Sequence, residues 1–295
     1  MIYAKCRSNS KINCVHFLHD NKIINVTKMT QLDKRYNEFK ELLLEKREKL
    51  LIIKINNPRK KNSLTIKAYI EFAKVLQLAG EDESVAVVAV TGTGDVYTSG
   101  NDLSLSMSGI TDFDEFLLDT DVILKNLIRS FYEFPKILVA VVNGPCIGIG
   151  MTTAALCDII YCTDNAYFLT PFTKLGLCPE GCSSHTFPRL LGKAKSIEVL
   201  LLNQKLTATE ALRLNFVADV VKPQELDTKI WPKIMDITRL PLGSLMAGKA
   251  LLMKAHNKDL ESALIEECAE LQKRFRSDEF FNALAAFGQR KSSKL

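Results

Sequence analysis

The apolar residues of this chain fall into two kinds of pattern, short continuous runs and longer stretches with helical spacing. Residues 85–90 and 138–142 are Val-rich runs with the length of a buried strand. Residues 65–78 and 112–134 repeat apolar side chains every three to four positions, which predicts helices that each bury one face. Glycine or proline follows each of these helices. The order of strands and helices therefore predicts an α/β fold with buried strands.

Residues 39–55 give two conflicting signals. Their many Leu, Glu and Lys residues favour a helix. Their apolar residues, however, form two runs, 42–44 and 50–55, which a charged stretch separates as in a β-hairpin. The pattern alone leaves both interpretations open.

The second half of the chain has mainly helical spacing. Residues 183–190, 194–202 and most of the chain from 226 onward are expected to be helical, whereas 216–221 is expected to be a strand. Residues 207–210 resemble a capping box that starts another short helix.

Apolar residues are also dense between Leu242 and Leu271, in a helix that Pro241 is expected to start. They are more numerous than one thin helical layer can bury. Two interpretations follow: an ordinary core, or a surface that another subunit covers.

The composition is that of a globular protein, with 47% hydrophobic and 25% charged residues among 295. This length suits one large domain or two modest ones. Residues 1–30 hold five cations and one acid, a net charge of +4 out of +5, so the rest of the chain is nearly neutral. That distribution argues against a broad nucleic-acid-binding surface. We expect no membrane span, because no apolar run approaches the roughly 20 residues that one needs.

Eight cysteines occur without a Cys-x-x-Cys pair, and Cys146, Cys157 and Cys162 lie in apolar runs. We interpret them as reduced, small apolar residues of an intracellular protein. One cysteine and two histidines lie close together within residues 14–19, but their spacing fits no zinc pattern. We therefore expect no metal site.

The two ends of the chain carry candidate targeting signals. Residues 1–35 are basic, poor in acids and without sustained periodicity. We expect a poorly ordered extension, with a transit peptide or a misassigned start as alternatives. The chain ends in Ser293, Lys294 and Leu295, a tripeptide that a peroxisomal import receptor binds. The expected location is the peroxisome matrix, with a mitochondrial pool as the alternative if the extension is a transit peptide.

One stretch combines an anion-binding turn with an isolated acid. After the strand predicted at 138–142, a glycine-rich turn at 148–150 opens a helix whose first N–H groups have no partner within it. Such groups can hold an anion or a developing oxyanion. Glu180 follows between Pro179 and Gly181. The combination is typical of proton transfer on a carbonyl compound, although a plain glycine-rich turn and a solvated glutamate is the simpler interpretation.

Five segments match one protein superfamily in order and spacing. They are NPRKKNSL at 57–64, TSGNDL at 98–103, NGPCIGIG at 143–150, CDIIY at 157–161 and TPFTKLGLCPEGCSS at 170–184. With them the chain resembles the enoyl-CoA hydratase/isomerase (crotonase-like) superfamily, and within it the peroxisomal Δ3,Δ2-enoyl-CoA isomerases. The resemblance extends from about residue 36 to the C-terminus.

The resemblance implies an α/β fold, with a crotonase-like spiral of ββα repeats up to about residue 235. C-terminal α-helices at about 241–290 follow in the family and mediate formation of a homotrimer. On this basis residues 36–295 form one crotonase-like domain behind the extension, and residues 39–55 form a β-hairpin.

The resemblance also assigns roles to residues. In the family, two backbone N–H groups form an oxyanion hole for the thioester oxygen. Here they correspond to those of Asn101 and Ile149, with Gly148 as the nearest alternative for the second. The acid of the isomerases corresponds to Glu180.

Hydratases of the family use two glutamates, at positions that hold Thr152 and Phe172 here. Their absence favours a proton shuttle by Glu180 alone, which converts 3-enoyl-CoA (cis or trans) to trans-2-enoyl-CoA in the β-oxidation of unsaturated fatty acids. The apolar setting of Phe172, Leu175 and Leu177 is expected to raise the pKa of Glu180. The alternatives are another crotonase-type enzyme, such as a hydratase or dienoyl-CoA isomerase, and a non-catalytic CoA-binding scaffold.

The implied substrate is an acyl-CoA thioester, and no cofactor is expected beyond the coenzyme A of the substrate itself. The residues expected to contact it near the oxyanion hole are Ser99, Gly100, Asn101, Asp102 and Leu103. Arg59, Lys60 and Lys61 are candidates for binding the CoA phosphates, although a basic triplet can equally be a solvated surface.

Overall fold

The computed structural model describes residues 18–19, 22–23, 32–102 and 112–292, with the side chains of the last helix up to residue 286. Leu103 and the terminal tripeptide lie outside the described residues, as does most of the N-terminal extension. Two short strands of that extension, β1 (Leu18–His19) and β2 (Lys22–Ile23), pair in antiparallel fashion.

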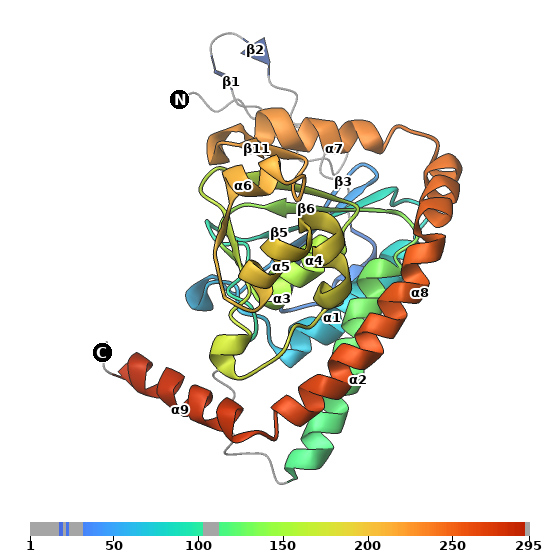
Figure 1. Cartoon of the computed structure of the whole chain (residues 1–295). Helices are drawn as coiled ribbons and strands as arrows, with labels where there is room; N and C mark the ends of the chain where they lie inside the picture. Colours follow the sequence, from blue (N-terminus) through green and yellow to red (C-terminus); the bar gives the residue numbers. More distant parts are fainter. Residues whose placement is uncertain (1–17, 20–21, 24–31, 103–111, 293–295) are drawn as a thin grey trace.

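Most of the apolar runs form one sheet of six strands, in the order β11-β8-β6-β5-β4-β3. Its strands are β3 (Leu42–Arg47), β4 (Leu50–Ile55), β5 (Val87–Gly92), β6 (Ile137–Val142), β8 (Ile159–Thr163) and β11 (Asp219–Val221). All neighbours run parallel except β3 and β4. Helices cover both faces of the sheet (Figure 1), and therefore a central strand such as β5 is apolar without alternation.

Residues 39–55 contain the antiparallel hairpin of β3 and β4, which confirms the interpretation drawn from the resemblance. Arg47 pairs with Leu50, and Glu48 adopts the left-handed conformation (φ 51°) in the two-residue turn between them. The helical propensity of this segment is overridden because alternate side chains of β4 enter the two hydrophobic cores on opposite faces of the sheet.

A second, smaller sheet supplies the second strand of two of the ββα repeats. It has the order β10-β9-β7, with β7 (Cys146–Ile147), β9 (Tyr167–Leu169) and β10 (Leu206–Thr207). The helices that follow the strand pairs are α1 (Ile66–Glu81), α2 (Phe113–Tyr132), α3 (Ile149–Ala155) and α4 (Ser183–Leu191). Among the described residues, β6-β7-α3 and β8-β9-α4 place one strand in each sheet before the helix begins, whereas β3 and β4 before α1 both lie in the larger sheet.

The remaining elements are almost entirely helical. They are α5 (Lys193–Leu200), α6 (Ala208–Arg213), α7 (Trp231–Ile237), α8 (Leu242–Arg274), α9 (Asp278–Ser292), a π-helix (Leu226–Ile230) and the 3-10 turns η1 (Lys34–Tyr36), η2 (Pro58–Lys60), η4 (Thr173–Leu175) and η5 (Pro223–Glu225). The predicted capping box is confirmed, because Thr207 and Glu210 each bind the other's backbone at the start of α6. Pro241 is the N-cap of α8, as predicted.

The strand predicted at 216–221 is wrong in its first half, because β11 begins only at Asp219. Phe216 and Val217 lie in a buried bend before it. Phe216 packs edge-on against Phe168, with ring centroids 5.2 Å apart. These residues are apolar because they fill the core between elements, and the sequence pattern alone does not distinguish that role from a strand.

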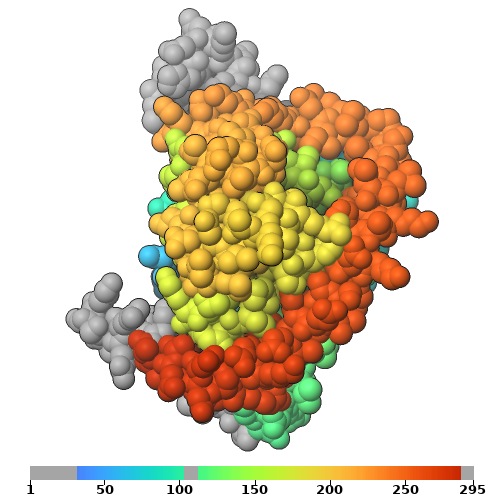
Figure 2. Space-filling model, in the orientation of Figure 1, coloured from blue at the N-terminus to red at the C-terminus, as the bar shows by residue number. Residues whose placement is uncertain are grey.

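The long helix α8 runs down one side of the molecule, beside α2 and α4 (Figures 1 and 2). Its C-terminal half is core, since Leu260, Leu264 and Leu271 are buried. Its N-terminal half carries Leu251 and Leu252, which are 77% and 79% exposed. The apolar excess predicted here is thus partly core and partly uncovered surface. No helix of the described residues is long and apolar enough to cross a membrane.

Candidate active site

The loops after β4, β5 and β6 meet at one edge of the sheet, and two buried asparagines tie them together. Asn62 donates through Nδ2 to the carbonyl oxygens of Thr93 (2.8 Å) and Val96 (2.7 Å). Asn143 donates in the same way to Gly92 (3.0 Å) and to Gly94 (2.7 Å). Because the carboxyl ends of parallel strands are where ligands bind in such sheets, these asparagines fix the loops that form the site. Sequence reasoning did not single them out, although both lie in the matching motifs.

Two backbone segments run side by side at this edge. The N–H of Ile147 donates to the carbonyl oxygen of Thr98 over 3.0 Å. Gly100 and Gly148 face each other with positive φ angles of 83° and 57°. A Cβ on Gly100 would lie 2.9 Å from the carbonyl oxygen of Ile147, so the close approach requires glycine there.

The close approach brings together the predicted oxyanion-hole residues. Asn101 ends one segment, and Ile149 is the first residue of α3 at the end of the other. Among the hydrogen bonds of the described residues, none has the backbone N–H of Asn101 or Ile149 as donor. The N–H of Gly148 is different, because it donates to the carbonyl oxygen of Leu169 over 2.8 Å.

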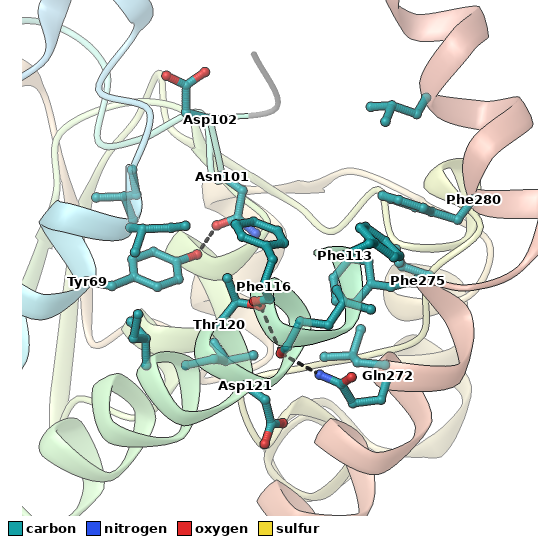
Figure 3. A pocket seen from close by; sticks show the side chains of 18 residues that line it. Tyr69, Asn101, Asp102, Phe113, Phe116, Thr120, Asp121, Gln272, Phe275 and Phe280 are labelled. Carbon is teal, nitrogen blue, oxygen red and sulfur yellow. Dashed lines mark hydrogen bonds between the residues drawn. The ribbon is translucent and has the colours of Figure 1, made fainter. Parts of the chain in front are cut away.

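The side chain of Asn101 is held in place by Tyr69 on α1, whose hydroxyl donates to Asn101 Oδ1 (Figure 3). Tyr69 is buried, and burial together with the charge of Glu180 raises the pKa of its phenol. The neutral hydroxyl is therefore a stable donor. Sequence reasoning did not identify Tyr69 as a site residue, and the available signal was its place on the buried face of a helix.

Glu180 is only 6% exposed, in the loop between β9 and α4. Thr152 on α3 donates through Oγ1 to Glu180 Oε1 over 3.2 Å. Gly181 has a φ of 68°, and a Cβ on it would lie 2.5 Å from Thr152 Oγ1. The glycine after the acid is therefore needed for the approach of this loop to α3. The threonine at the position of a hydratase glutamate contacts Glu180 directly.

The surroundings of Glu180 favour its neutral form. Burial and, secondly, the nearby carboxylate of Glu267 raise the pKa of Glu180 to about 8, against a smaller opposing effect of the Thr152 hydrogen bond. This agrees with the expectation of a raised pKa. Glu180 lines a cavity of about 90 Å3 together with Phe172, Leu175 and Leu177, the apolar residues predicted around it.

Glu267 is a second buried acid close to the site, and sequence reasoning did not identify it. It is 6% exposed and projects from α8. Its carboxylate accepts hydrogen bonds from the backbone N–H groups of Cys182 and Ser184, both at 2.7 Å. The available signal was its position: Glu267 falls on the same helical face as Leu264 and Leu271, where an acid is unusual.

A larger cavity of about 190 Å3 adjoins the first, and the two share part of their lining. The shared residues are Asn101, Leu124, Leu177, Leu271 and Phe275. Its walls come from α1, α2, α8 and α9, and Figure 3 shows the aromatic side chains of Phe113, Phe116, Phe275 and Phe280 around it. Such a wall suits a flexible apolar chain.

The basic triplet at 59–61 is exposed, and an ion pair and a hydrogen bond join it to the segment 99–102. Lys60 forms an ion pair with Asp102, at 2.8 Å between Nζ and Oδ2. Ser99 donates from its backbone N–H to the carbonyl oxygen of Lys61 over 2.9 Å. Arg59, on η2, is exposed beside them. The structure thus brings the triplet together with the segment of Ser99, Gly100, Asn101 and Asp102. Leu103 and Ser293, Lys294 and Leu295 lie outside the described residues.

Comparison with known proteins gives a family match and several curated relatives. The family model described as enoyl-CoA hydratase/isomerase matches residues 45–294. Enoyl-CoA delta isomerase 2 of Rattus norvegicus is 38% identical over 259 residues, which are 88% of this chain and 66% of the relative. Enoyl-CoA delta isomerase 3, peroxisomal, of Mus musculus is 35% identical over 260 residues, 88% of this chain and 82% of the relative.

The chain thus spans slightly less than two thirds of the rat relative. A solved structure of an enoyl-CoA hydratase/isomerase from Pseudoalteromonas atlantica superposes with a TM-score of 0.77 at 28% identity, over 85% of this chain and 98% of that one. Residues 45–294, which the family model matches, include both sheets apart from the first three residues of β3, and all the helices of the spiral. The fold is therefore crotonase-like, and the chain belongs to the enoyl-CoA hydratase/isomerase family.

Proposed function

We propose that the protein is a Δ3,Δ2-enoyl-CoA isomerase, which converts cis- or trans-3-enoyl-CoA to trans-2-enoyl-CoA in the β-oxidation of unsaturated fatty acids. One observation carries the proposal: a single buried carboxylate, Glu180, lines an apolar cavity together with Asn101 and Ile149. The relatives from rat and mouse are named as enoyl-CoA delta isomerases, which supports the same activity.

The mechanism begins with the thioester oxygen bound by the backbone N–H groups of Asn101 and Ile149. Glu180 removes a proton from C2, and the electrons of that C–H bond form a dienolate whose negative charge lies on the oxygen. Each N–H of an oxyanion hole commonly stabilises such a charge by about 3–4 kcal/mol. Glu180 then returns the proton to C4, and the double bond moves to C2–C3. Gly148 is disfavoured as the second donor because its N–H already binds Leu169.

Hydration is disfavoured by the surroundings of Glu180. It requires a water molecule that two carboxylates activate, whereas Thr152 donates to Glu180 and Phe172 supplies only an aromatic wall. Glu267 does not replace the second acid, because both of its oxygens accept backbone N–H groups and it is not part of the cavity lining. One carboxylate can serve both steps of the isomerisation, since C2 and C4 lie on the same side of a bent allyl unit.

We place the acyl chain and the CoA of the substrate from the geometry around the two cavities. The acyl chain enters the larger cavity, whose aromatic walls bury it. Arg59, Lys60 and Lys61 lie at the exposed rim and bind the phosphates of the CoA. No metal ion or redox cofactor takes part in this chemistry, because a proton shuttle within one substrate needs neither.

The terminal tripeptide supports a location in the peroxisome matrix, reached through an import receptor that binds Ser293, Lys294 and Leu295. The mouse relative is named as a peroxisomal isomerase. The exposed Leu251 and Leu252 support association with other copies of the chain, and the resemblance to the family implies a homotrimer.

The function is tested with purified protein, a 3-enoyl-CoA and a 2-enoyl-CoA side by side. Wild-type protein should isomerise the first and should not hydrate the second. In Glu180→Gln the kcat of isomerisation should fall about 100-fold or more, because a positioned acid–base group contributes about 10²–10⁴-fold. Glu266→Gln removes the same charge from an exposed position on α8 and should keep full activity.

Three results would contradict the proposal. A Glu180→Gln variant with more than about a tenth of the wild-type kcat would show that another group is the base. Faster turnover of the 2-enoyl-CoA would identify a hydratase. Tight binding of both thioesters without any turnover would identify a CoA-binding scaffold.

A further inference from the structure

The turn that carries Glu180 has an unusual backbone and depends on a distant residue. Gly181 and Cys182 have φ angles of 68° and 60°, so two successive residues adopt the left-handed conformation. Cys182 is also the N-cap of α4, and its side chain makes no capping hydrogen bond. The first N–H groups of a helix need acceptors. For α4 the acceptor is Glu267, from a helix 85 positions further along the chain.

Hydrogen bonds join the buried Glu267 to this turn. The carboxylate is 6% exposed, and its two oxygens accept one backbone N–H each, from Cys182 and Ser184 at 2.7 Å. These residues follow Glu180 by two and four positions. The negative charge also lies at the positive end of a nine-residue helix, where it is stabilised.

We propose that Glu267 is a positioning residue for the isomerisation: it fixes the turn that aims Glu180 into the cavity and keeps a second negative charge behind that base. The inference rests on the proposed function, because it assigns Glu180 the role of the base. Glu267 acts through Glu180 and does not contact the substrate, since it is not part of the cavity lining.

The electrostatic part of this role follows from the groups that face Glu180. Tyr69 on α1, Cys178 and Cys182 in the loop, and Cys268 on α8 lie close enough to interact with its charge, and burial raises the pKa of each of them. They are therefore neutral near pH 8. Among the described residues, Glu267 is the charged neighbour that shifts the pKa of Glu180, and the Thr152 hydroxyl is the remaining polar contact. Burial raises the pKa of Glu267 as well, while the hydrogen bonds from Ser184 and Cys182 act against that shift and favour its ionised form.

The test is the pH dependence of kcat/KM in Glu267→Gln, with Glu266→Gln as the matched control. Glutamine keeps the shape of the side chain but has one acceptor in place of two, and it has no charge. Without the second charge, Glu180 ionises more easily, and the acid limb of the profile should move about one pH unit towards acid. The plateau should fall about tenfold, because the base is weaker and its turn is held less firmly. Glu266→Gln should match wild type in both respects.

A second variant separates position from charge. Glu267→Asp keeps the charge on a shorter side chain that cannot reach both N–H groups. It should keep the wild-type acid limb and lose kcat at every pH. A variant series that changes only the melting temperature, with wild-type profiles throughout, would overturn the proposal and leave Glu267 as a structural residue.

The titration of Glu180 can also be followed without turnover, by the infrared band of its protonated carboxyl group. This band is assigned to Glu180 because it should be missing in Glu180→Gln. In wild type the band should persist at neutral pH and disappear near pH 8, whereas in Glu267→Gln it should disappear at lower pH. A wild-type band already lost near pH 5 would refute the inference even if Glu267→Gln does not fold. If wild type turns over no enoyl-CoA, the proposed function fails, while this titration still decides the coupling of the two acids.

Discussion

At the scale of single residues, the site depends on where each polar group finds its partner. Thr152 binds Glu180, Tyr69 binds Asn101, and Glu267 binds the turn after Glu180. The N–H groups of Asn101 and Ile149 are left for a ligand. An ionised carboxylate in an apolar cavity lowers the free energy of unfolding, and the pH dependence of stability measures this effect.

The stability of the protein should depend on pH through Glu180. Its pKa is raised from 4.5 to about 8 in the folded state, mainly by burial. The folded state thus binds more protons than the unfolded state between these values, and stability falls as pH rises from about 4.5 to about 8. Glu180→Gln does not titrate, so its stability relative to wild type should increase by up to about 1.4 kcal/mol per pH unit in this range.

Urea unfolding at about pH 5 and about pH 8, at one protein concentration, checks this prediction. Titrating groups away from the site affect both proteins alike, so the difference between the two curves reports Glu180 together with its coupling to Glu267. A difference that is the same at both pH values would show that Glu180 titrates normally in the folded protein.

At the scale of elements, α9 completes the larger cavity and packs on the loop that leads to Glu180. Phe280 and Leu284 line the cavity. Gly176 lies directly under this helix, since a Cβ there would be 2.7 Å from the backbone of Glu279 and Phe280. Phe275 and Phe280 contact each other edge-on across the break between α8 and α9, with ring centroids 5.1 Å apart. The two C-terminal helices therefore shape the cavity that we propose for the acyl chain of the same protein.

Phe280→Ala should weaken binding of long acyl chains more than of short ones. Phe280 is half-buried and lines the cavity, so removing its ring loses up to about 1.5–3 kcal/mol of apolar contact with a chain that reaches it, and KM for a long-chain 3-enoyl-CoA should rise about tenfold. A short-chain ester that does not reach α9 should be nearly unaffected. Phe281→Ala is the control, because the ring of Phe281 is 38% exposed and does not line the cavity. Equal effects on both esters would place the acyl chain elsewhere.

At the scale of the whole molecule, the first half of α8 presents an apolar surface that no described part of the chain covers. Leu251 and Leu252 are the most exposed large apolar side chains among the described residues. Exposed apolar patches are uncommon on monomers and mark contacts with other chains. The cavities that form the proposed active site contact the other half of the helix, so the exposed leucines and the cavity lining lie on separate stretches of α8.

The protein should form a homotrimer that Leu251→Ser/Leu252→Ser dissociates. Light scattering after size exclusion should give the mass of three chains for wild type and a smaller mass for the double variant, because the covered apolar area is lost. Dilution should lower the melting temperature of wild type, since association is part of its stability. Leu118→Ser, at an exposed leucine of α2, is the control and should leave the mass unchanged. A wild-type monomer with full activity would disprove the prediction.

The sequence by itself determined the elements with clear local periodicity and the residues that lie in the matching motifs. Neighbouring residues determine the runs that form β5 and β6, the helices α1 and α2, the capping box of α6 and the glycine-rich turn before α3. Local spacing is enough for them because their hydrogen bonds or apolar faces depend on positions a few residues apart. Glu180, Asn101 and Ile149 were found by their motifs.

Only the tertiary structure decided what depends on residues far apart. The hairpin of 39–55 forms against its helical propensity because two cores bury β4, and Phe216 fills a space between elements that no local pattern describes. Glu267 meets the turn of Glu180 from 85 positions away. A sequence pattern records which side chains are apolar and at what spacing, whereas the identity of the partner across a core is fixed only when the elements pack.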